Sequence, residues 1–310
     1  MMQVIHQLEE IPSGLVRPVV TLGNFDGVHR GHQQVLARLR EVSEAREGTS
    51  IVITFRPHPI KILHPERAPS LICTYDEKLA LIGQAGVDWV VEIPFDRDFS
   101  EWSAERFIEE LLVKRIGVAF VLAGPDCHFG KNRLGDARML TAHGHVHGFD
   151  VETLEPHVDG DQVVSSSRIR HLLATQGDVQ SAAALLGRPF SLRGVVVKGD
   201  QRGRQIGVPT ANIRLATELV PAHGVYAAWA TVRDSRPRPA AVNIGIRPTF
   251  GKDLLSVEAH LLDFDDDVYG ESLQLDLIDR VRDEVRFDGV DALVAQIHAD
   301  VQWVRERLND

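Results

Sequence analysis

The sequence is poor in cysteine and aromatic residues, and it has no long apolar run. Of its 310 residues, two are cysteines, Cys73 and Cys127, and 6% are aromatic. The cysteines lie far apart and outside any C-x-x-C pair, so they offer no zinc framework and suit a reducing compartment. No stretch approaches the roughly 18 apolar residues of a membrane span, and the N-terminal residues lack a secretion signal. We therefore expect a cytoplasmic protein.

Runs of basic residues and the common nucleotide-binding fingerprints are missing as well. The formal net charge is −10, which argues against a nucleic acid or an anionic membrane as the main partner. Neither G-x-x-x-x-G-K-[ST] nor G-x-G-x-x-G occurs, so any phosphate site needs another local explanation. With 44% hydrophobic and 25% charged residues the composition is that of a globular protein, and the length favours two domains.

The first half of the chain alternates short apolar runs with helical patterns. The runs typical of buried strands are residues 19–22, 51–55, 89–93 and 118–123. Apolar stripes at helical spacing follow His29, the capping box Thr74–Glu77, and Ser103, and the last stripe ends at Gly117. This order predicts an α/β fold with a doubly wound parallel sheet, whose ligands bind outside the carboxyl ends of the strands.

From about Gly187 the pattern changes to short β-like runs separated by turn residues. These runs are residues 193–197, 225–231, 240–244, 257–262 and 273–279. Their spacing predicts an antiparallel sheet or small β-barrel, and apolar residues at helical spacing over 291–308 predict a terminal helix packed on it. We expect two domains, residues 1–186 and residues 187–310.

A glycine-rich turn follows the first strand and opens the first helix. It reads Gly23-Asn24-Phe25-Asp26-Gly27-Val28-His29-Arg30-Gly31-His32. The glycines let the backbone approach a ligand closely, at a helix start with free N–H groups and a positive dipole end. His29 and His32 project from one side of the first helical turn, where both can donate hydrogen bonds to phosphate oxygens. The turn is therefore predicted to bind ATP phosphates. The alternatives are a plain structural turn and a His-x-x-His zinc pair, which lacks a third ligand nearby.

A second glycine-rich loop lies in the C-terminal half and is basic within an acidic protein. It contains Lys198, Gly199, Arg202, Gly203, Arg204 and Gly207. Such a loop can cover phosphates, although a solvated β-turn has the same composition. Pro209 then fixes the turn that presents Thr210 and Asn212, whose hydroxyl and amide oxygens are hard ligands suited to Mg²⁺.

Several segments together resemble one known family. His29-Arg30-Gly31-His32 looks like the H-x-G-H signature of nucleotidylyltransferases, and Pro209-Thr210-Ala211-Asn212 is similar to a riboflavin kinase motif. Further matches are Thr54–Pro59, Gly124–Gly130, Val164–Arg170, Gly224–Tyr226, Asn243–Phe250 and Val257–His260. The resemblance spans nearly the whole chain, and it is to the bacterial bifunctional riboflavin kinase/FMN adenylyltransferase family, also called FAD synthetases.

The resemblance implies two reactions that use ATP and Mg²⁺. In the C-terminal domain, the γ-phosphoryl group of ATP passes to the 5′-hydroxyl of riboflavin, with Glu258 as the base. In the N-terminal domain, the phosphate of FMN attacks the α-phosphorus of ATP and gives FAD and pyrophosphate, without a covalent enzyme intermediate. His29 and His32 would hold the ATP phosphates. The residues implied to close over them are Ser165, Ser166, Ser167 and Arg168.

The resemblance also implies residues that contact flavin. His58, between two prolines at a strand end, would form a wall for the flavin or its phosphate. Asp126 and Phe129 lie in the loop after the fourth strand, where Cys127 replaces an aromatic residue of the family pattern. In the kinase domain the implied binding residues are Asn243, Arg247 and Arg282, with Glu284 and Phe287 beside the flavin. Val208 stands there in place of an aromatic residue.

Two further patterns are interpreted as surface features. His143, His145 and His147 alternate near a helix stop, and we expect them to be surface residues rather than a metal cluster. The acidic turn Asp263–Asp267 lacks the rest of a calcium-loop pattern and is interpreted as a solvated turn.

Two rival functions are another nucleotidylyltransferase with an appended barrel and a flavin-binding regulator without catalysis. The predicted Mg²⁺ and base residues of the barrel argue against both.

Overall fold

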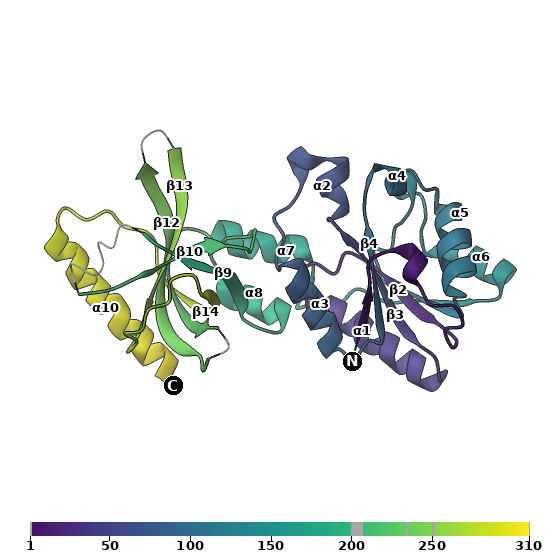
Figure 1. Ribbon diagram of the computed structural model, residues 1–310, viewed down its shortest axis with the longest axis horizontal. Helices are drawn as coiled ribbons and strands as arrows, with labels where there is room; N and C mark the ends of the chain where they lie inside the picture. The colour runs from purple at the N-terminus through teal and green to yellow at the C-terminus, as the bar shows by residue number, and fades with distance from the viewer. Residues whose placement is uncertain (1, 200–206, 234, 250–251, 310) are drawn as a thin grey trace. The chain divides into compact units, whose positions relative to one another are not determined.

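The chain forms two compact units in the computed structural model, which describes residues 2–199, 207–233, 235–249 and 252–309 (Figure 1). The first unit is Met1–Ser70 with Tyr75–Ser165, and the second is Leu71–Thr74 with Ser166–Asp310. Residues 166–186 thus group with the second unit, and the expected domain boundary at residue 186 stays a prediction.

The first unit is built on a six-stranded sheet with the order β1-β4-β3-β2-β5-β6, and all five pairings are parallel. The strands are β1 (Gln3–Ile5), β2 (Val19–Leu22), β3 (Ser50–Arg56), β4 (Trp89–Pro94), β5 (Phe120–Ala123) and β6 (Asp150–Thr153). The doubly wound parallel sheet predicted from the sequence is confirmed. Strand β1 was not expected, because three residues are too few to show a pattern.

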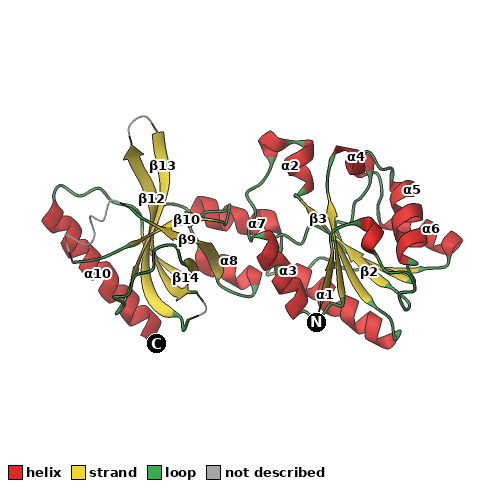
Figure 2. Ribbon diagram, in the orientation of Figure 1, coloured by secondary structure: helices red, strands yellow, loops and turns green. Residues whose placement is uncertain are grey.

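Helices cover both faces of this sheet (Figure 2). The longer helical segments of this unit are α1 (Arg30–Ala45), α3 (Tyr75–Gln84), η3 (Phe107–Ile116) and α6 (Ala137–His147). The shorter ones are η1 (Leu8–Glu10), α2 (Pro59–Leu63), η2 (Pro65–Arg67), α4 (Arg97–Ser100), α5 (Ala104–Arg106) and η4 (Lys131–Arg133). Val19 and Val52 pack with α1 and α3, whereas Val20 and Ile53 pack with η3 and α6. Burial on both faces explains why these strands are continuous apolar runs.

The strand order reverses at β2, which has β3 on one side and β5 on the other. Two loops therefore begin side by side at the carboxyl ends of these strands: residues 23–29 after β2 and residues 124–130 after β5. Such a switch point is where doubly wound sheets bind ligands. The fold thus places the glycine-rich turn where the sequence predicted it. A small hairpin of β7 (Val158–Asp159) and β8 (Gln162–Val163) ends the unit.

The second unit is a closed antiparallel barrel with the strand order β10-β13-β12-β11-β14-β9. Its strands are β9 (Phe190–Val197), β10 (Ala211–Leu215), β11 (Gly224–Val232), β12 (Arg238–Thr249), β13 (Lys252–Leu261) and β14 (Ser272–Arg282). Its helical segments are α7 (Ser166–His171), η5 (Leu172–Gln176), α8 (Val179–Leu186) and α10 (Val290–Asn309). Val304 and Leu308 of α10 pack on Ala227 and Leu262, so the predicted barrel with its terminal helix is confirmed. Strand β10 was missed.

Candidate active sites

The turn between β2 and α1 is buried and places an imidazole at the start of the helix. Phe25, Asp26, Val28 and His29 are each at most 5% exposed. His29 is the N-cap residue of α1, and its Nδ1 accepts a hydrogen bond from the backbone N–H of His32 at 3.4 Å. Because Nδ1 is the acceptor, a neutral His29 carries its proton on Nε2, which is then the donor nitrogen.

His32 lies directly against His29. The two rings stack with their centroids 3.7 Å apart, and the Phe25 ring lies 5.0 Å from His32. Nδ1 of His32 is buried and has no hydrogen-bond partner among the described residues. Burial and then the neighbouring His29 hold the pKa of His32 well below its usual value. A buried nitrogen without a partner at a helix start suits a ligand that brings its own hydrogen-bonding oxygens.

Glycines make this close packing possible. A Cβ at Gly31 would lie 3.3 Å from two atoms of the His29 ring, and Gly27 has the left-handed φ of 78°. Phe25 and Val28 also have positive φ, 51° and 39°, although neither is glycine. Positive φ at bulky residues is uncommon and is found at sites where function requires it. The loop is therefore held in a conformation that local propensity alone does not favour.

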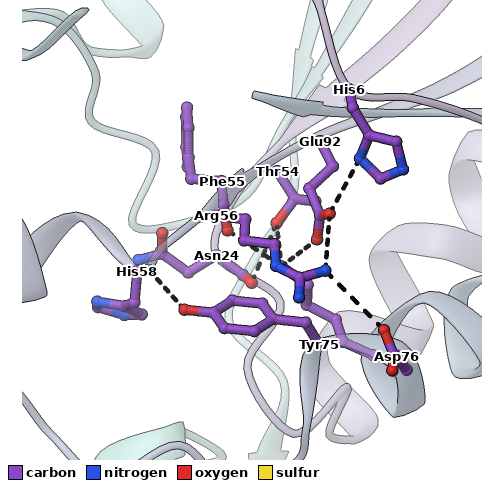
Figure 3. A network of polar contacts seen from close by, with 10 residues as sticks. His6, Asn24, Thr54, Phe55, Arg56, His58, Tyr75, Asp76 and Glu92 are labelled. Carbon is purple, nitrogen blue, oxygen red and sulfur yellow. Dashed lines mark hydrogen bonds and ion pairs between the residues drawn. The ribbon is translucent and has the colours of Figure 1, made fainter. Parts of the chain in front are cut away.

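A network of polar contacts that includes a buried ion pair reaches this loop (Figure 3). Lys78 of α3 donates from Nζ to the Thr54 hydroxyl at 3.0 Å and to the Phe55 carbonyl at 3.3 Å. Its Nζ also lies 3.8 Å from a carboxylate oxygen of Glu92 on β4. The Thr54 hydroxyl in turn donates to the backbone carbonyl of Asn24 at 3.2 Å. A chain of contacts therefore runs from a buried ion pair to the backbone of the glycine-rich turn at Asn24.

The same network reaches the loop after β3. The Arg56 guanidinium lies 3.7 Å from Glu92 and 4.8 Å from the centre of the Tyr75 ring. The Tyr75 hydroxyl accepts a hydrogen bond from the backbone N–H of His58 at 2.9 Å, and His58 caps α2 by accepting from Ile60 at 3.3 Å. Sequence reasoning singled out His58 but missed the network. Its one local signal is a glutamate within the otherwise apolar run of β4.

The loop after β5 contains two residues that were predicted to contact flavin, and their exposure differs. Asp126 is exposed, but Phe129 is 5% exposed and packs against Phe107 at a centroid distance of 5.1 Å. Cys127 is buried in the same core, and its burial raises the pKa of the thiol to about 12. Cys127 therefore stays a protonated core residue. The role of Phe129 in flavin binding stays a prediction.

The serine-rich segment lies at the division between the units. Ser165 ends the first unit, whereas Ser166, Ser167 and Arg168 form the start of α7 in the second. Their expected position over the ATP phosphates stays a prediction. Within the first unit, the segment that leads to Ser165 contacts α1, because a Cβ at Gly31 would lie 3.6 Å from Cβ of His157.

In the barrel, three polar residues form a row across neighbouring strands. Glu258 on β13 is paired directly with Asn212 on β10 and with Asn243 on β12. Directly paired residues of antiparallel strands point to the same face and touch. The row thus joins three residues that were singled out in separate motifs, Asn212, Asn243 and Glu258.

Hydroxyl groups orient the Glu258 carboxylate. Thr210 donates to Oε2 of Glu258 at 3.1 Å, and Ser256 donates to Oε1 at 3.3 Å. A Cβ at Gly199 would lie 2.3 Å from the Asn212 amide, so the absence of a side chain lets the backbone at Gly199 approach Asn212 closely. Thr210, Asn212 and Glu258 together offer a hydroxyl, an amide oxygen and a carboxylate. This set of hard oxygen donors fits Mg²⁺.

The other residues predicted for the kinase site do not belong to the row formed by Asn212, Glu258 and Asn243. Arg282 forms a bidentate ion pair with Asp300 of α10 at 2.7 and 3.0 Å, with Phe287 centred 5.8 Å from its guanidinium. In this structure Arg282 fastens the terminal helix to the barrel. Lys198 is exposed, Gly207 has φ 79° and Val208 is buried. The predicted residues Arg202, Gly203 and Arg204 and the side chain of Arg247 lie outside the described residues.

The acidic turn behaves as expected. Asp265, Asp266 and Asp267 are exposed. Asp263 pairs with Arg305 of α10 at 2.7 Å.

Among the described residues, no helix is both long and apolar enough to cross a membrane.

Comparisons with known proteins match one family model to each half of the chain. The FAD synthetase family model matches residues 13–168, and the riboflavin kinase family model matches residues 186–308. A bifunctional riboflavin kinase/FMN adenylyltransferase of Escherichia coli K12 is 39% identical over 97% of this chain and 96% of its own. Its counterparts in Pseudomonas fluorescens and Haemophilus influenzae are 39% and 36% identical over 98% and 99% of this chain, and 97% and 100% of their own.

A solved structure extends the likeness to the whole fold. A crystal structure titled as a macrolide-efflux protein from Streptococcus pneumoniae has a TM-score of 0.88 and 31% identity, covering 98% of both chains. With two matching family models and full-length relatives, the chain belongs to the bifunctional riboflavin kinase/FMN adenylyltransferase family.

Proposed function

We propose that the chain phosphorylates riboflavin at the Thr210–Asn212–Glu258 cluster of the barrel and adenylylates the resulting FMN at the His29–His32 turn. Family membership supports the two-step synthesis of FAD. The observation that carries the assignment of residues is the row of Asn212, Glu258 and Asn243 across three strands. It brings a base and oxygen ligands from distant segments to one place.

Glu258 acts as the base in the kinase step. It accepts the proton of the riboflavin 5′-hydroxyl while the oxygen forms a bond to the γ-phosphorus and the bond to ADP breaks. The hydrogen bonds from Thr210 and Ser256 fix the direction of the carboxylate. Thr210 and Asn212 would hold Mg²⁺, which neutralises charge on the ATP phosphates. Lys198, next to Gly199, would bring a positive charge to the ATP phosphates.

The His29–His32 turn performs the adenylyl transfer by position and charge. A phosphate oxygen of FMN attacks the α-phosphorus of ATP, and pyrophosphate leaves from the opposite side. The start of α1 supplies backbone N–H groups, and Nε2 of His29 supplies a donor aimed at the phosphates. The lowered pKa keeps His32 neutral before ATP arrives, so the anion meets an imidazole that can gain a proton.

The remaining predicted roles complete the proposal. His58 and Asp126 flank the flavin end of the first site, and Ser165 to Arg168 close over the phosphates. We place the protein in the cytoplasm, where ATP is available and where the free thiols of Cys73 and Cys127 stay reduced.

Product analysis tests both assignments. Purified protein with riboflavin, ATP and Mg²⁺ should form FMN and then FAD on chromatography. His32→Ala should stop FAD formation and let FMN accumulate. Glu258→Gln should stop FMN formation from riboflavin while still making FAD from added FMN. Loss of both activities in either variant would show that the sites are wrongly assigned.

A further inference from the structure

A cluster of metal-binding side chains lies outside both proposed ATP sites. Glu109 of η3 and His143 and His147 of α6 each bring one ligand atom to within 4.8 Å of the other two. The two imidazoles lie one helical turn apart, and their rings are nearly parallel with centroids 5.8 Å apart. The sequence analysis interpreted these histidines as surface residues near a helix stop, and it did not identify Glu109, which is distant in the sequence, as a third ligand.

The backbones that carry the cluster are firmly held. Leu140 and Gly144 on the inner face of α6 are buried, and a Cβ at Gly144 would lie 2.4 Å from the Phe149 carbonyl oxygen. On η3, Ile108 and Leu111 are 0% exposed. The two helical segments therefore keep a fixed separation, and only side-chain rotations are needed to bring three ligand atoms onto one ion. Figure 1 shows α5, which continues into η3, beside α6.

The position of the cluster separates it from the adenylyltransferase site. Helix α6 leads through Gly148 and Phe149 into β6, so its last turn lies toward the amino ends of the parallel strands. The His29 turn follows β2 at the carboxyl ends. A cation at Glu109 would therefore lie toward the opposite edge of the sheet from the ATP phosphates.

The ligand set selects the class of cation. Two imidazoles and one carboxylate suit borderline divalent metals such as Zn²⁺, Co²⁺ and Ni²⁺, whereas Mg²⁺ prefers oxygen ligands and retained water. We propose that Glu109, His143 and His147 bind one divalent transition-metal ion, which bridges η3 and α6 and leaves coordination positions open to water. An ion that binds the folded chain alone stabilises the first unit by mass action.

Cobalt binding to the full-length, untagged chain tests this proposal. After removal of metal with EDTA, Co²⁺ is titrated in the presence of millimolar Mg²⁺, and its visible absorption reports coordination by protein ligands. We expect one Co²⁺ per chain. His143→Ala, His147→Ala and Glu109→Gln should each weaken binding by at least about tenfold, as loss of even an outer partner does.

His145 provides the matched control. It is exposed on the same helix but does not belong to the cluster, so His145→Ala should bind Co²⁺ like the unaltered chain. Alanine favours helices, so none of these histidine substitutions should unfold α6. Zn²⁺ should also raise the melting temperature of the unaltered chain and of His145→Ala, but not that of His147→Ala.

Three results would overturn the proposal. The first is equal loss of affinity in His145→Ala and His147→Ala, and the second is displacement of Co²⁺ by millimolar Mg²⁺. The third is binding that persists in His147→Ala but is lost in His32→Ala, which would place the ion at the His-x-x-His turn instead. None of these readouts depends on the flavin reactions, so the outcome is independent of the proposed function.

Discussion

Lys78 offers a demanding test of how the first site is held together. The residue is 4% exposed. Its ammonium group donates hydrogen bonds to Thr54 and Phe55 and pairs with Glu92. Lys78→Met keeps the length and the apolar stem of the side chain but removes the charge and both hydrogen bonds. Thr54 then loses the donor that holds its hydroxyl toward the Asn24 carbonyl.

The expected cost follows from the contacts that remain. Removing one partner of a buried ion pair costs about 3–5 kcal/mol when the other charge is left alone. Glu92 keeps Arg56 at 3.7 Å and His6 at 3.3 Å, so its carboxylate is not isolated. We therefore expect a smaller loss in the free energy of unfolding of the first unit, about 2–4 kcal/mol. Misplacement of the Asn24 loop by about 1 Å should lower adenylyl transfer by about 100-fold.

The bifunctional chain carries its own control for this experiment. FAD formation from added FMN and ATP should fall, while FMN formation from riboflavin, which depends on the barrel, should stay within about twofold. Lys114→Met is the matched control, because Lys114 pairs with Glu110 in water-exposed positions, where loss of an ion pair leaves the free energy of unfolding nearly unchanged. The double variant with Glu92→Gln should regain stability but not FAD formation. Normal adenylyl transfer in Lys78→Met would refute the positioning role, and equal loss of both activities would point to general unfolding.

Three further changes probe the two sites. Because the pKa of His32 is lowered in the folded chain, the unfolded chain takes up a proton near pH 6.5 that the folded chain does not, and the free energy of unfolding should fall as the pH drops below that value. In thermal unfolding from pH 5 to 8, the melting temperature should fall less steeply for His32→Gln than for the unaltered chain. Gly199→Ala would push a methyl group into the Asn212 amide, so FMN formation should drop at least about tenfold while FAD formation from added FMN continues. Arg282→Met should lower the unfolding free energy of the second unit by about 1–3 kcal/mol in denaturant titrations, because it leaves the Asp300 carboxylate, 5% exposed, without its cation.

The features that could be predicted from sequence are those written in local patterns. The apolar runs 19–22 and 51–55 needed only burial on both faces to be recognised as strands, and β2 and β3 contain them. The His29 turn was predictable because its glycines and imidazoles follow one another along the chain. Ser103 was also correctly predicted as a cap, since its hydroxyl accepts a hydrogen bond from the backbone N–H of Arg106 at 3.1 Å.

Features that depend on distant contacts could not be predicted in the same way. Lys78 lies in an amphipathic helix, and its partners Thr54 and Glu92 lie on two separate strands. The pairing of Glu258 with Asn243 depends on the register of β12 and β13, which no single segment specifies. Strand β10 was missed because Pro209 and Thr210 at its start have the composition of a turn.

Contacts within one segment can also be outweighed by packing. The family resemblance implies that Arg282 lies beside the flavin, which stays a prediction, whereas its ion pair with Asp300 of the terminal helix follows from no local pattern. The packing of Phe129 in the core against Phe107 is likewise not visible in the sequence, and its role in flavin binding stays a prediction. In both cases burial against another element decides where the side chain lies, and burial is a property of the whole fold.

The two sites hold their reactive groups by different physical means, and this decides how each responds to substitution. The backbone of the turn before His29 is joined through Thr54 to a buried ion pair between α3 and β4, so changes at Lys78 and Glu92 should reach this turn. Glu258 is instead oriented by the hydroxyls of Thr210 and Ser256, which lie beside it on the barrel. A lost neutral hydrogen bond costs about 1 kcal/mol, whereas a lost partner of a buried charge costs several. Adenylyl transfer should therefore be the activity more easily damaged by substitutions in the core, and riboflavin phosphorylation the one damaged mainly by substitutions at the site itself.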